Sequence, residues 1–343
     1  MPKPAREAMI CGMGPPLHEV GARSAGASSA RAAIPVVVLG GSDREPGEIP
    51  DAAGKRALAT YKGMALRVAG RPLVELVIAR LRACGGFAAI SIAGPARVYA
   101  GVDPDVGVID TDADVGTNLR AAIDGLRASG ARGPLAFLTC DVLPDVAELR
   151  SVLCDYHESP SALWYPLVRA PEDPRELGAF GWKPDYVIRP EPGAAPVKVL
   201  PGHLLVADPA ALRLELLYRL IGAAYDSRNR PVHERRRAML RKALTGLLHQ
   251  DVLHVASLRL PSLTWTVLVH GLAIARELRT GELTLASLER HVGRIALAAR
   301  HRRREPDRAV RLPIVDAITL AKDVDTYEEA RALGARVESE AQD

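Results

Sequence analysis

The sequence predicts an α/β fold in which a doubly wound, mainly parallel sheet lies between two layers of helices. Short apolar runs typical of strands occur at 34–39, 88–93 and 135–139, and segments with helical spacing of apolar residues separate them at 72–84 and 119–128. Strands that alternate with helices in this order run parallel and are joined by right-handed crossovers. We therefore expect the functional residues at the carboxyl ends of these strands, where open α/β sheets bind ligands.

Length and composition fit one enlarged α/β domain that carries an insertion. The chain has 343 residues, of which 48% are hydrophobic and 25% charged, which is typical of a soluble folded protein. Aromatic residues make up only 4%, so the core is expected to consist of Leu, Val, Ile and Ala. The net charge of +4 is small for this length, so no nucleic-acid partner is expected from the total charge.

Cysteine usage and apolar runs indicate a cytoplasmic protein. No two cysteines form a C-x-x-C pair, which argues against a disulfide framework or a structural zinc site; they are Cys11, Cys84, Cys140 and Cys154. Segment 1–33 lacks the apolar core of a signal peptide, and we interpret it as a mobile tail. The longest apolar stretch, 263–275, is shorter than the roughly 20 residues of a membrane span, so a buried helix and no transmembrane segment are expected.

The second half of the chain has a different pattern. Residues 197–207 are typical of a short hairpin or strand pair, and 209–225 is strongly helical. The stretch 233–304 is helical almost throughout and carries arginine clusters, the last of them at 300–304. A solvated charged face is the usual explanation of such clusters, and contact with anionic lipid is the alternative. An extended segment, 311–320, then precedes a final helix.

The first predicted strand ends in a glycine turn. Leu39 is followed by Gly40 and Gly41, and Arg44 comes shortly afterwards. Glycines allow backbone N–H groups to approach phosphates, and an arginine can neutralise phosphate charge, although a plain turn explains the pair equally well. The chain has neither G-x-G-x-x-G nor G-K-[ST] here, so neither a dinucleotide fingerprint nor a P-loop is predicted.

An aspartate follows the third predicted strand. Asp141 comes directly after 135–139 and Cys140, and Pro144 follows it. A carboxylate at the carboxyl end of a central strand can hold Mg²⁺ beside a triphosphate, and a turn-forming aspartate before a proline is the alternative.

These motifs resemble those of nucleotidyltransferases of the molybdopterin-guanylyltransferase-like type. The family pattern has L-x-G-G, a basic residue, K-x-L and G-[KR]-P-[LM] in this order, and Leu39-Gly40-Gly41, Lys62 and Gly70-Arg71-Pro72-Leu73 match it. The loop before Arg44 is longer than in the family, and Lys62 lies one residue farther from the proline, so Lys55 is the rival lysine. A lysine here would meet the triphosphate as a point charge, whereas an exposed loop lysine is the alternative.

The resemblance extends over about 34–333 and implies further site residues. It places the second metal carboxylate in Asp323-Val324-Asp325-Thr326, where Asp325 is the first choice and Asp323 the second; a helix cap is the alternative interpretation. It also places base recognition in 111–118, with Gly116 and Thr117 as candidates. Thr117 or Asn118 capping the helix at 119–128 is the competing explanation.

The resemblance implies a three-layer, Rossmann-like nucleotidyltransferase fold with a mixed, mainly parallel sheet and a helical insertion. We assign 1–33 to a disordered tail and 34–207 to the nucleotide-binding α/β domain. Residues 208–310 form the helical insertion, and 311–343 supply the final sheet segment and the C-terminal helix that complete the α/β domain.

The implied activity is Mg²⁺-dependent transfer of a nucleoside monophosphate group from a nucleoside triphosphate, CTP or GTP favoured, to a phosphorylated small molecule. The expected catalytic residues are Lys62, Arg44 and Asp141, and the expected metal ligands are Asp141 and Asp325. The expected nucleotide-binding residues are Leu39, Gly40, Gly41, Lys62, Gly116, Thr117 and Asp141.

Two other functions stay open at this point. The chain could be a degenerate relative that binds a nucleotide or a partner protein without catalysis, because its phosphate loop departs from the family pattern. Less favoured is a basic nucleic-acid-binding protein built on the arginine-rich helices. Peripheral contact with a membrane also remains open.

Overall fold

The structure is a computed structural model, and it describes residues 33–42, 60–177, 185–227, 247–248, 251–252, 263–304 and 309–340. All of the described residues belong to one compact unit, 32–343. The predicted tail, apart from Ala33, lies outside the described residues, as do Arg44, Lys55 and most of the arginine-rich part of 233–262.

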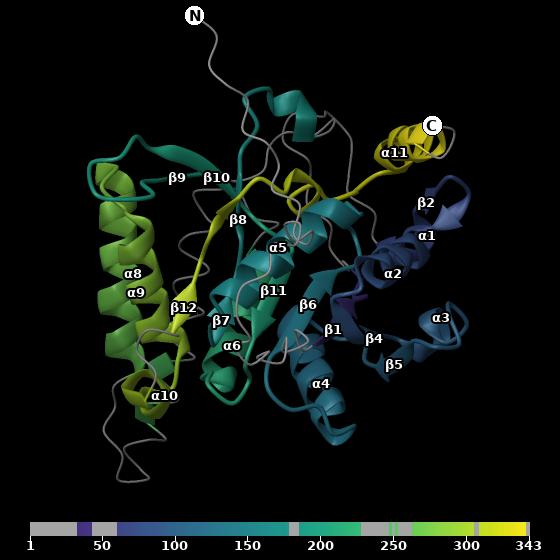
Figure 1. Ribbon diagram of the computed structural model, residues 1–343. Coiled ribbons are helices and arrows are strands. Elements are labelled where there is room, and N and C mark those ends of the chain that lie inside the picture. Colours follow the sequence, from purple (N-terminus) through teal and green to yellow (C-terminus); the bar gives the residue numbers. More distant parts are fainter. Residues whose placement is uncertain are drawn as a thin grey trace, which may run out of the picture. The chain divides into compact units, whose positions relative to one another are not determined.

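A seven-stranded sheet forms the centre of the 32–343 unit, in the order β12-β7-β11-β6-β1-β4-β5 (Figure 1). β1 pairs in parallel with β4 on one side and with β6 on the other, whereas β11 is antiparallel to both β6 and β7. The mainly parallel α/β sheet predicted from the sequence is therefore confirmed. The strands are β1 (Ile34–Leu39), β4 (Phe87–Gly94), β5 (Gly107–Asp110), β6 (Leu135–Thr139), β7 (Leu163–Trp164), β11 (Leu204–Ala207) and β12 (Val310–Arg311).

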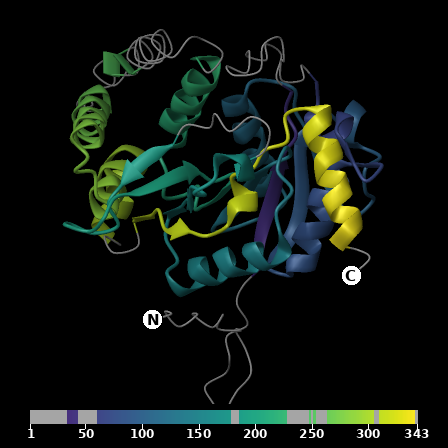
Figure 2. The same ribbon diagram turned by 90° about the horizontal axis from the view of Figure 1, so that it is seen from above.

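Helices cover both faces of this sheet (Figure 2). On one face α2 packs against α5, and on the other α4 packs against α6. The bounds are α2 (Leu73–Cys84), α4 (Val115–Ala128), α5 (Val146–Glu158) and α6 (Leu214–Ser227). These two layers and the sheet between them make up the three-layer arrangement.

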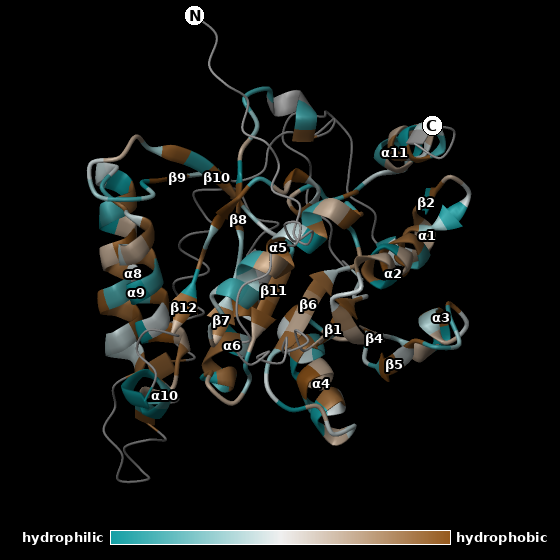
Figure 3. Ribbon diagram, viewed as in Figure 1, coloured by the Kyte–Doolittle hydropathy of each residue, from teal (hydrophilic) through white to brown (hydrophobic). Residues whose placement is uncertain are grey.

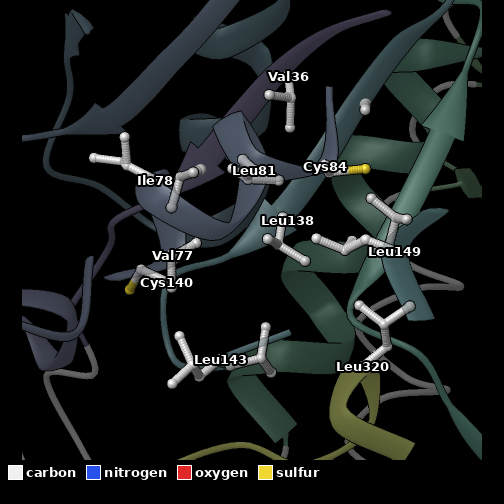
Figure 4. Close-up of a cluster of buried hydrophobic side chains, with 14 of the residues drawn as sticks. Val36, Val77, Ile78, Leu81, Cys84, Leu138, Cys140, Leu143, Leu149 and Leu320 are labelled. Carbon is white, nitrogen blue, oxygen red and sulfur yellow. The ribbon is translucent and has the colours of Figure 1, made fainter. Parts of the chain in front are cut away.

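The central strands are buried on both faces, which explains their continuous apolar runs. Val36 and Val38 belong to the cluster that contains α2 and α5, whereas Val37 belongs to the cluster that contains α4 and α6. All three valines have 0% exposure, because side chains alternate across a strand and each face meets a helix layer. Figure 4 shows Val36 close to the α2 side chains, and Figure 3 shows the hydrophobic character of β1, β6 and β11.

The two strands predicted within 197–207 are present, but their predicted pairing is wrong, because they belong to different sheets. β10 pairs with β8 and β9 in a four-stranded sheet of order β13-β8-β10-β9, whereas β11 pairs with β6 and β7. The two connecting residues bond elsewhere: Gly202 N–H donates to Pro166 O (3.2 Å) and His203 N–H to Leu320 O (2.8 Å). The bounds are β8 (Leu167–Arg169), β9 (Tyr186–Ile188), β10 (Val197–Pro201) and β13 (Ile314–Val315).

Several helix boundaries differ from those predicted. α4 begins at Val115 rather than at 119, and its cap is Asp114, whose carboxylate accepts from the N–H groups of Gly116 (2.9 Å) and Thr117 (3.2 Å). The proposal that Thr117 or Asn118 caps this helix is therefore wrong. The predicted extended segment 311–320 contains β13 but ends in a 3-10 turn. The remaining short elements are α1 (Lys62–Ala65), β2 (Arg67–Val68), β3 (Arg71–Pro72), α3 (Ala96–Tyr99), η1 (Pro174–Leu177) and η3 (Ile318–Leu320).

The described part of the predicted helical segment contains α8 (Leu263–Thr280), α9 (Leu285–Ala296) and α10 (Ala299–Arg304). α8 packs against α9, and α9 contacts α6 and β12. The expectation of a buried helix at 263–275 is wrong for one side of α8, because Trp265 is 72% exposed and Leu272 is 66% exposed. Within the described residues, no helix has both the length and the apolar character needed to cross a bilayer.

The contact between α4 and α6 depends on a glycine. A Cβ atom at Gly116 would lie 2.5 Å from the carbonyl oxygen of Tyr218 in α6, closer than two such atoms can approach. We expect Gly116→Ala to lower the free energy of unfolding by about 1–3 kcal/mol, because one helix must shift. Gly222→Ala is the matched control, since its Cβ would meet its nearest neighbour, Asp114 Oδ1, at an ordinary 3.5 Å. Denaturant titration measures both, and equal effects would contradict the expected clash.

Candidate active site

The carboxyl ends of two adjacent parallel strands define the site. β1 and β6 are in register at their last residues, Leu39 and Thr139, and both chains leave the sheet there. Gly40 N–H still donates to Ala93 O of β4 (2.8 Å), and Cys140 N–H donates to Leu39 O (3.2 Å). The glycine turn after β1 and the acidic loop after β6 therefore lie side by side, as the parallel topology predicts.

The glycine turn is bounded by side chains that a Cβ atom would crowd. At Gly40 such an atom would lie 2.8 Å from the ring of Tyr99, which is buried under the turn. At Gly41 it would lie 3.0 Å from the amide nitrogen of Asn118. Glycine lets the backbone approach Tyr99 and Asn118 this closely. A ligand at this edge therefore meets the main chain of the turn rather than side chains.

Asn118 holds the loop 111–114 next to this turn. Its side-chain oxygen accepts from Thr111 Oγ1 (2.8 Å) and from Ala113 N–H (3.1 Å), and its amide nitrogen donates to Ala113 O (3.0 Å). Asn118 is 4% exposed, so these bonds use the polar groups of a buried amide. The sequence suggested Asn118 only as a cap, because the pattern around it does not show which loop its side chain would meet.

The two residues predicted to select the base lie in the first turn of α4. Gly116 is buried against α6, and the hydroxyl of Thr117 donates to Asp114 Oδ2 (2.5 Å). Both residues therefore have a structural task in α4. Their contact with a nucleobase stays a prediction, and Asn118 is the residue of this segment that touches the glycine turn.

A polar cluster joins the loop 111–114 to the start of α1. Tyr61 Oη donates to Asp112 Oδ2 (2.9 Å), and the guanidinium of Arg97 donates to the same carboxylate (2.7 Å). Because Tyr61 immediately precedes Lys62, this cluster fixes where α1 begins.

Lys62 points from the first residue of α1 into the acidic loops. Its ammonium forms an ion pair with Asp325 and lies 3.9 Å from Asp141 Oδ2. Burial by itself would lower the pKa of Lys62, but the charges of Asp141 and Asp325 outweigh it and raise the pKa above its ordinary value. Lys62 is therefore a fixed positive charge at the site.

The segment that carries Asp323 and Asp325 is held against the loop after β6. Val142 and Asp323 form an antiparallel bridge, and Val324 N–H donates to Asp141 O (2.6 Å). Two main-chain contacts thus bring the C-terminal carboxylates to Asp141. These carboxylates are far apart in sequence. They meet because two short extended segments pair outside the main sheet, not because adjacent strands of that sheet end side by side.

The cap of the last helix, α11 (Tyr327–Glu340), is Thr326 rather than Asp325. Thr326 Oγ1 accepts from Glu329 N–H (3.3 Å), and Glu329 Oε2 accepts in return from Thr326 N–H (3.2 Å), which is a capping box. Glu329 Oε2 also accepts from Asp325 N–H (2.8 Å). The Asp325 carboxylate is therefore not used as the cap, and it faces Lys62.

Asp141, Asp323 and Asp325 together could hold a metal ion. One carboxylate oxygen from each lies within 4.8 Å of the others. Burial, reinforced by the Asp323 charge, raises the pKa of Asp325 although Lys62 opposes the shift. Three carboxylates with one ammonium leave an excess of negative charge, and oxygen ligands of this kind fit Mg²⁺. The sequence ranked Asp323 second, but the structure places it with the other two.

His203 is a site residue that the sequence analysis missed. Its Nδ1 lies 2.8 Å from Thr139 Oγ1 and 4.0 Å from Asp141 Oδ1. Because β11 runs antiparallel, its first residue lies at the edge where β6 ends, and His203 directly precedes it. The Gly202-His203 pair between two apolar runs was visible in the sequence, but the direction of β11 was not.

Comparison with solved structures supports the assignment of the fold. A structure described as a hypothetical transferase from Thermus thermophilus matches with a TM-score of 0.52 and 21% identity, covering 87% of this chain and 100% of that chain. The two proteins therefore share a fold. CMP:2-keto-3-deoxy-manno-octonic acid synthetase complexed with CTP matches with a TM-score of 0.38 and 13% identity, over 63% of this chain and 86% of that one.

A further match is HddC from Yersinia pseudotuberculosis complexed with GMP-PN, with a TM-score of 0.37 and 12% identity, covering 54% of this chain and 79% of that chain. No protein-family model matches this sequence, and no curated protein matches it.

The crowded carboxylates predict a measurable effect of Mg²⁺ on stability. We expect Mg²⁺ to raise the Tm, because binding to the folded protein at about 100 times Kd adds about 2.7 kcal/mol. Asp323→Asn should shrink this increase and, without metal, should raise the Tm, because one of the repelling charges is gone. Asp105→Asn is the control, since its side chain is 85% exposed on another loop. Differential scanning calorimetry with and without Mg²⁺ measures both effects, and an identical Mg²⁺ response in the two variants would contradict the site.

Proposed function

We propose that this protein is a Mg²⁺-dependent nucleotidyltransferase of the molybdopterin-guanylyltransferase-like type. It transfers a nucleoside monophosphate group from a nucleoside triphosphate, with CTP or GTP as the favoured donor, to a phosphorylated small-molecule acceptor and releases pyrophosphate. Buried Cys84 and Cys140, which are free thiols, suit a reducing compartment, so we propose a cytoplasmic location.

The observation that carries this proposal is the meeting of two loops at one sheet edge. The turn at Gly40 and Gly41 offers bare main chain. The loop after β6 brings Asp141 beside it, and Asp141 meets Lys62 from α1 and the carboxylates of Asp323 and Asp325. A triphosphate needs both features, because its oxygens bind backbone N–H groups and cations while a divalent ion shares its remaining charge. The shared fold with a structure described as a transferase agrees with this.

The residues have distinct proposed roles. Gly40 and Gly41 bind the phosphates, Asn118 and the loop it holds border the base and ribose, and Lys62 neutralises charge that develops around the α-phosphorus. Asp325 positions the Lys62 ammonium through their ion pair. Asp141 and Asp325, now joined by Asp323, would hold Mg²⁺, which supplies charge neutralisation for the leaving pyrophosphate.

The proposed reaction needs no side-chain nucleophile. An ionised phosphate oxygen of the acceptor attacks the α-phosphorus in line, and the bond from the α-phosphorus to the oxygen that bridges it to the β-phosphorus breaks. That oxygen leaves with its electron pair as part of pyrophosphate, so no proton has to move. His203, which directly precedes β11 and lies beside Asp141, is our proposed contact for the acceptor.

Binding of nucleotides tests the proposal directly. ATP, CTP, GTP and UTP are each titrated calorimetrically with Mg²⁺ into the parent protein, Asp141→Ala, Asp325→Ala and the control Asp105→Ala. We expect one triphosphate to bind selectively and its affinity to fall by about tenfold or more, about 1.4 kcal/mol, in the two site variants alone.

The titration, followed by an assay of pyrophosphate release, separates the alternatives. Pyrophosphate release on adding sugar or polyol phosphates supports transfer, whereas selective binding without release with any acceptor supports a nucleotide-binding protein that has lost catalysis. If no triphosphate bound, or if the site variants matched Asp105→Ala, the shared fold would not carry the proposed function.

The glycine turn gives an independent prediction. Gly41→Ala places a methyl group 3.0 Å from Asn118 Nδ2, so the turn or the Asn118 amide must move by a few tenths of an ångström. We expect triphosphate affinity to fall by about tenfold while the fold is kept. Gly101→Ala is the control, because a Cβ atom there meets nothing within 4 Å. Equal affinities of the two variants in the same titration would argue against phosphate binding at the turn.

A further inference from the structure

The outer side of α8 carries an apolar stripe that the described residues leave uncovered. Trp265, Val269 and Leu272 are 72%, 41% and 66% exposed, and their spacing of four and then three residues places them on one side of the helix. Leu248 and Val252, which are 54% and 65% exposed, lie on a preceding helical segment. Contiguous apolar surface of this kind on a folded protein marks an interaction site.

This stripe faces outward because the opposite side of α8 is fixed to the rest of the domain. Leu263 and Val267 pack with α6 and α9, and Ile274 packs in the cluster that contains β12. Across the helix pair, His270 Nδ1 lies 2.9 Å from His291 Nδ1. Because these contacts hold one side of α8, the helix cannot rotate to bury Trp265 without breaking them.

The segment beside the helix start is anchored to it as well. Asp251 is buried, and its carboxylate accepts from the N–H groups of Leu263 (3.2 Å) and Thr264 (2.9 Å). Val252 directly follows this aspartate, and Leu248 precedes it by three residues. Two further exposed apolar side chains therefore lie on the segment that is anchored to the start of α8.

The segment that carries the apolar stripe is rich in exposed arginines. The same side of α8 continues with Arg276 and Arg279, at the next four- and three-residue steps, and both are exposed. The neighbouring helices add exposed arginines at Arg290, Arg294, Arg300, Arg303 and Arg304.

Acidic residues do not balance this charge within 263–304. Glu277 accepts from Ser287 Oγ (2.5 Å), Glu289 accepts from Leu312 N–H (2.8 Å), and Glu282 is the exposed acidic side chain of the segment. Burial lowers the pKa of His270, and the charges of His291 and of Arg294 lower it further.

We propose that α8 and α10 form a docking surface for the anionic surface of a lipid bilayer, with Trp265, Val269 and Leu272 inserted among the headgroups. Tryptophan prefers this interfacial zone, and arginines bind lipid phosphates while their stems cover apolar surface. A nucleic acid would use the arginines but not the aliphatic stripe. The docking surface is separate from the proposed active site, so this proposal does not depend on the proposed nucleotidyl transfer.

Vesicle binding of the full chain tests the proposal. Flotation is measured with phosphatidylcholine vesicles and with vesicles of phosphatidylcholine and phosphatidylglycerol. We expect binding to the anionic vesicles alone, weakened by salt, with a blue shift of tryptophan emission that Trp265→Phe reduces. The double variant Trp265→Ser/Leu272→Ser should lose at least tenfold in binding, and the exposed Tyr327→Ser, which is 52% exposed on α11, should lose nothing.

The arginines have a matched control on α11. Arg303→Gln/Arg304→Gln should lower binding by about fivefold for each arginine removed, whereas the equally exposed Arg331→Gln/Arg336→Gln pair should not. Circular dichroism confirms that each variant is folded, as expected for substitutions at exposed positions. Absence of binding to anionic vesicles, or equal binding by Trp265→Ser/Leu272→Ser, would overturn the proposal. Self-association that this variant abolishes, without vesicle binding, would instead assign the surface to a second copy of the chain.

Discussion

The excess of negative charge around Lys62 is the constraint on which the rest of the site depends. Asp141, Asp323 and Asp325 approach to within 4.8 Å, and one ammonium cannot neutralise them. Such a cluster costs stability unless main-chain contacts hold it together and a further cation shares its charge. The bond from Val324 N–H to Asp141 O and the capping box at Thr326 provide that support, so the folding energy of two distant segments maintains a site that repels itself.

The layout of the fold could be predicted because strands that are buried on both faces have continuous apolar sequences. The run 34–39 is apolar on both faces because Val37 meets one helix layer and its neighbours the other, and a strand of that kind has few alternatives. The turn between β10 and β11 has no such signal in the sequence. Both strands are apolar and close in sequence. They belong to different sheets because their pairing partners come from other segments, and the connecting residues Gly202 and His203 bond to Pro166 and Leu320.

The residues of the candidate site likewise fall into those that the sequence predicts and those that it does not. Asp141 and Gly40 were predictable because each directly follows a recognisable strand, so local sequence fixes their position. His203 was not, because its place depends on the antiparallel direction of β11. The packing role of Gly116 was not predictable either, because it depends on Tyr218, far along the chain, whereas its contact with the base stays a prediction. Residues whose role depends on a partner from another segment escape prediction from local pattern.

The late position of the second acidic segment affects how the protein is made. Lys62 and Asp325 are 263 residues apart, so a nascent chain emerging from the ribosome holds the glycine turn, Lys62 and Asp141 long before their partners exist. Until residues 323–325 have emerged, the growing chain has the turn without its acidic cluster. Termination between Asp141 and Asp323 would therefore leave this edge with one of its three carboxylates, and synthesis itself sets the moment at which the site is completed.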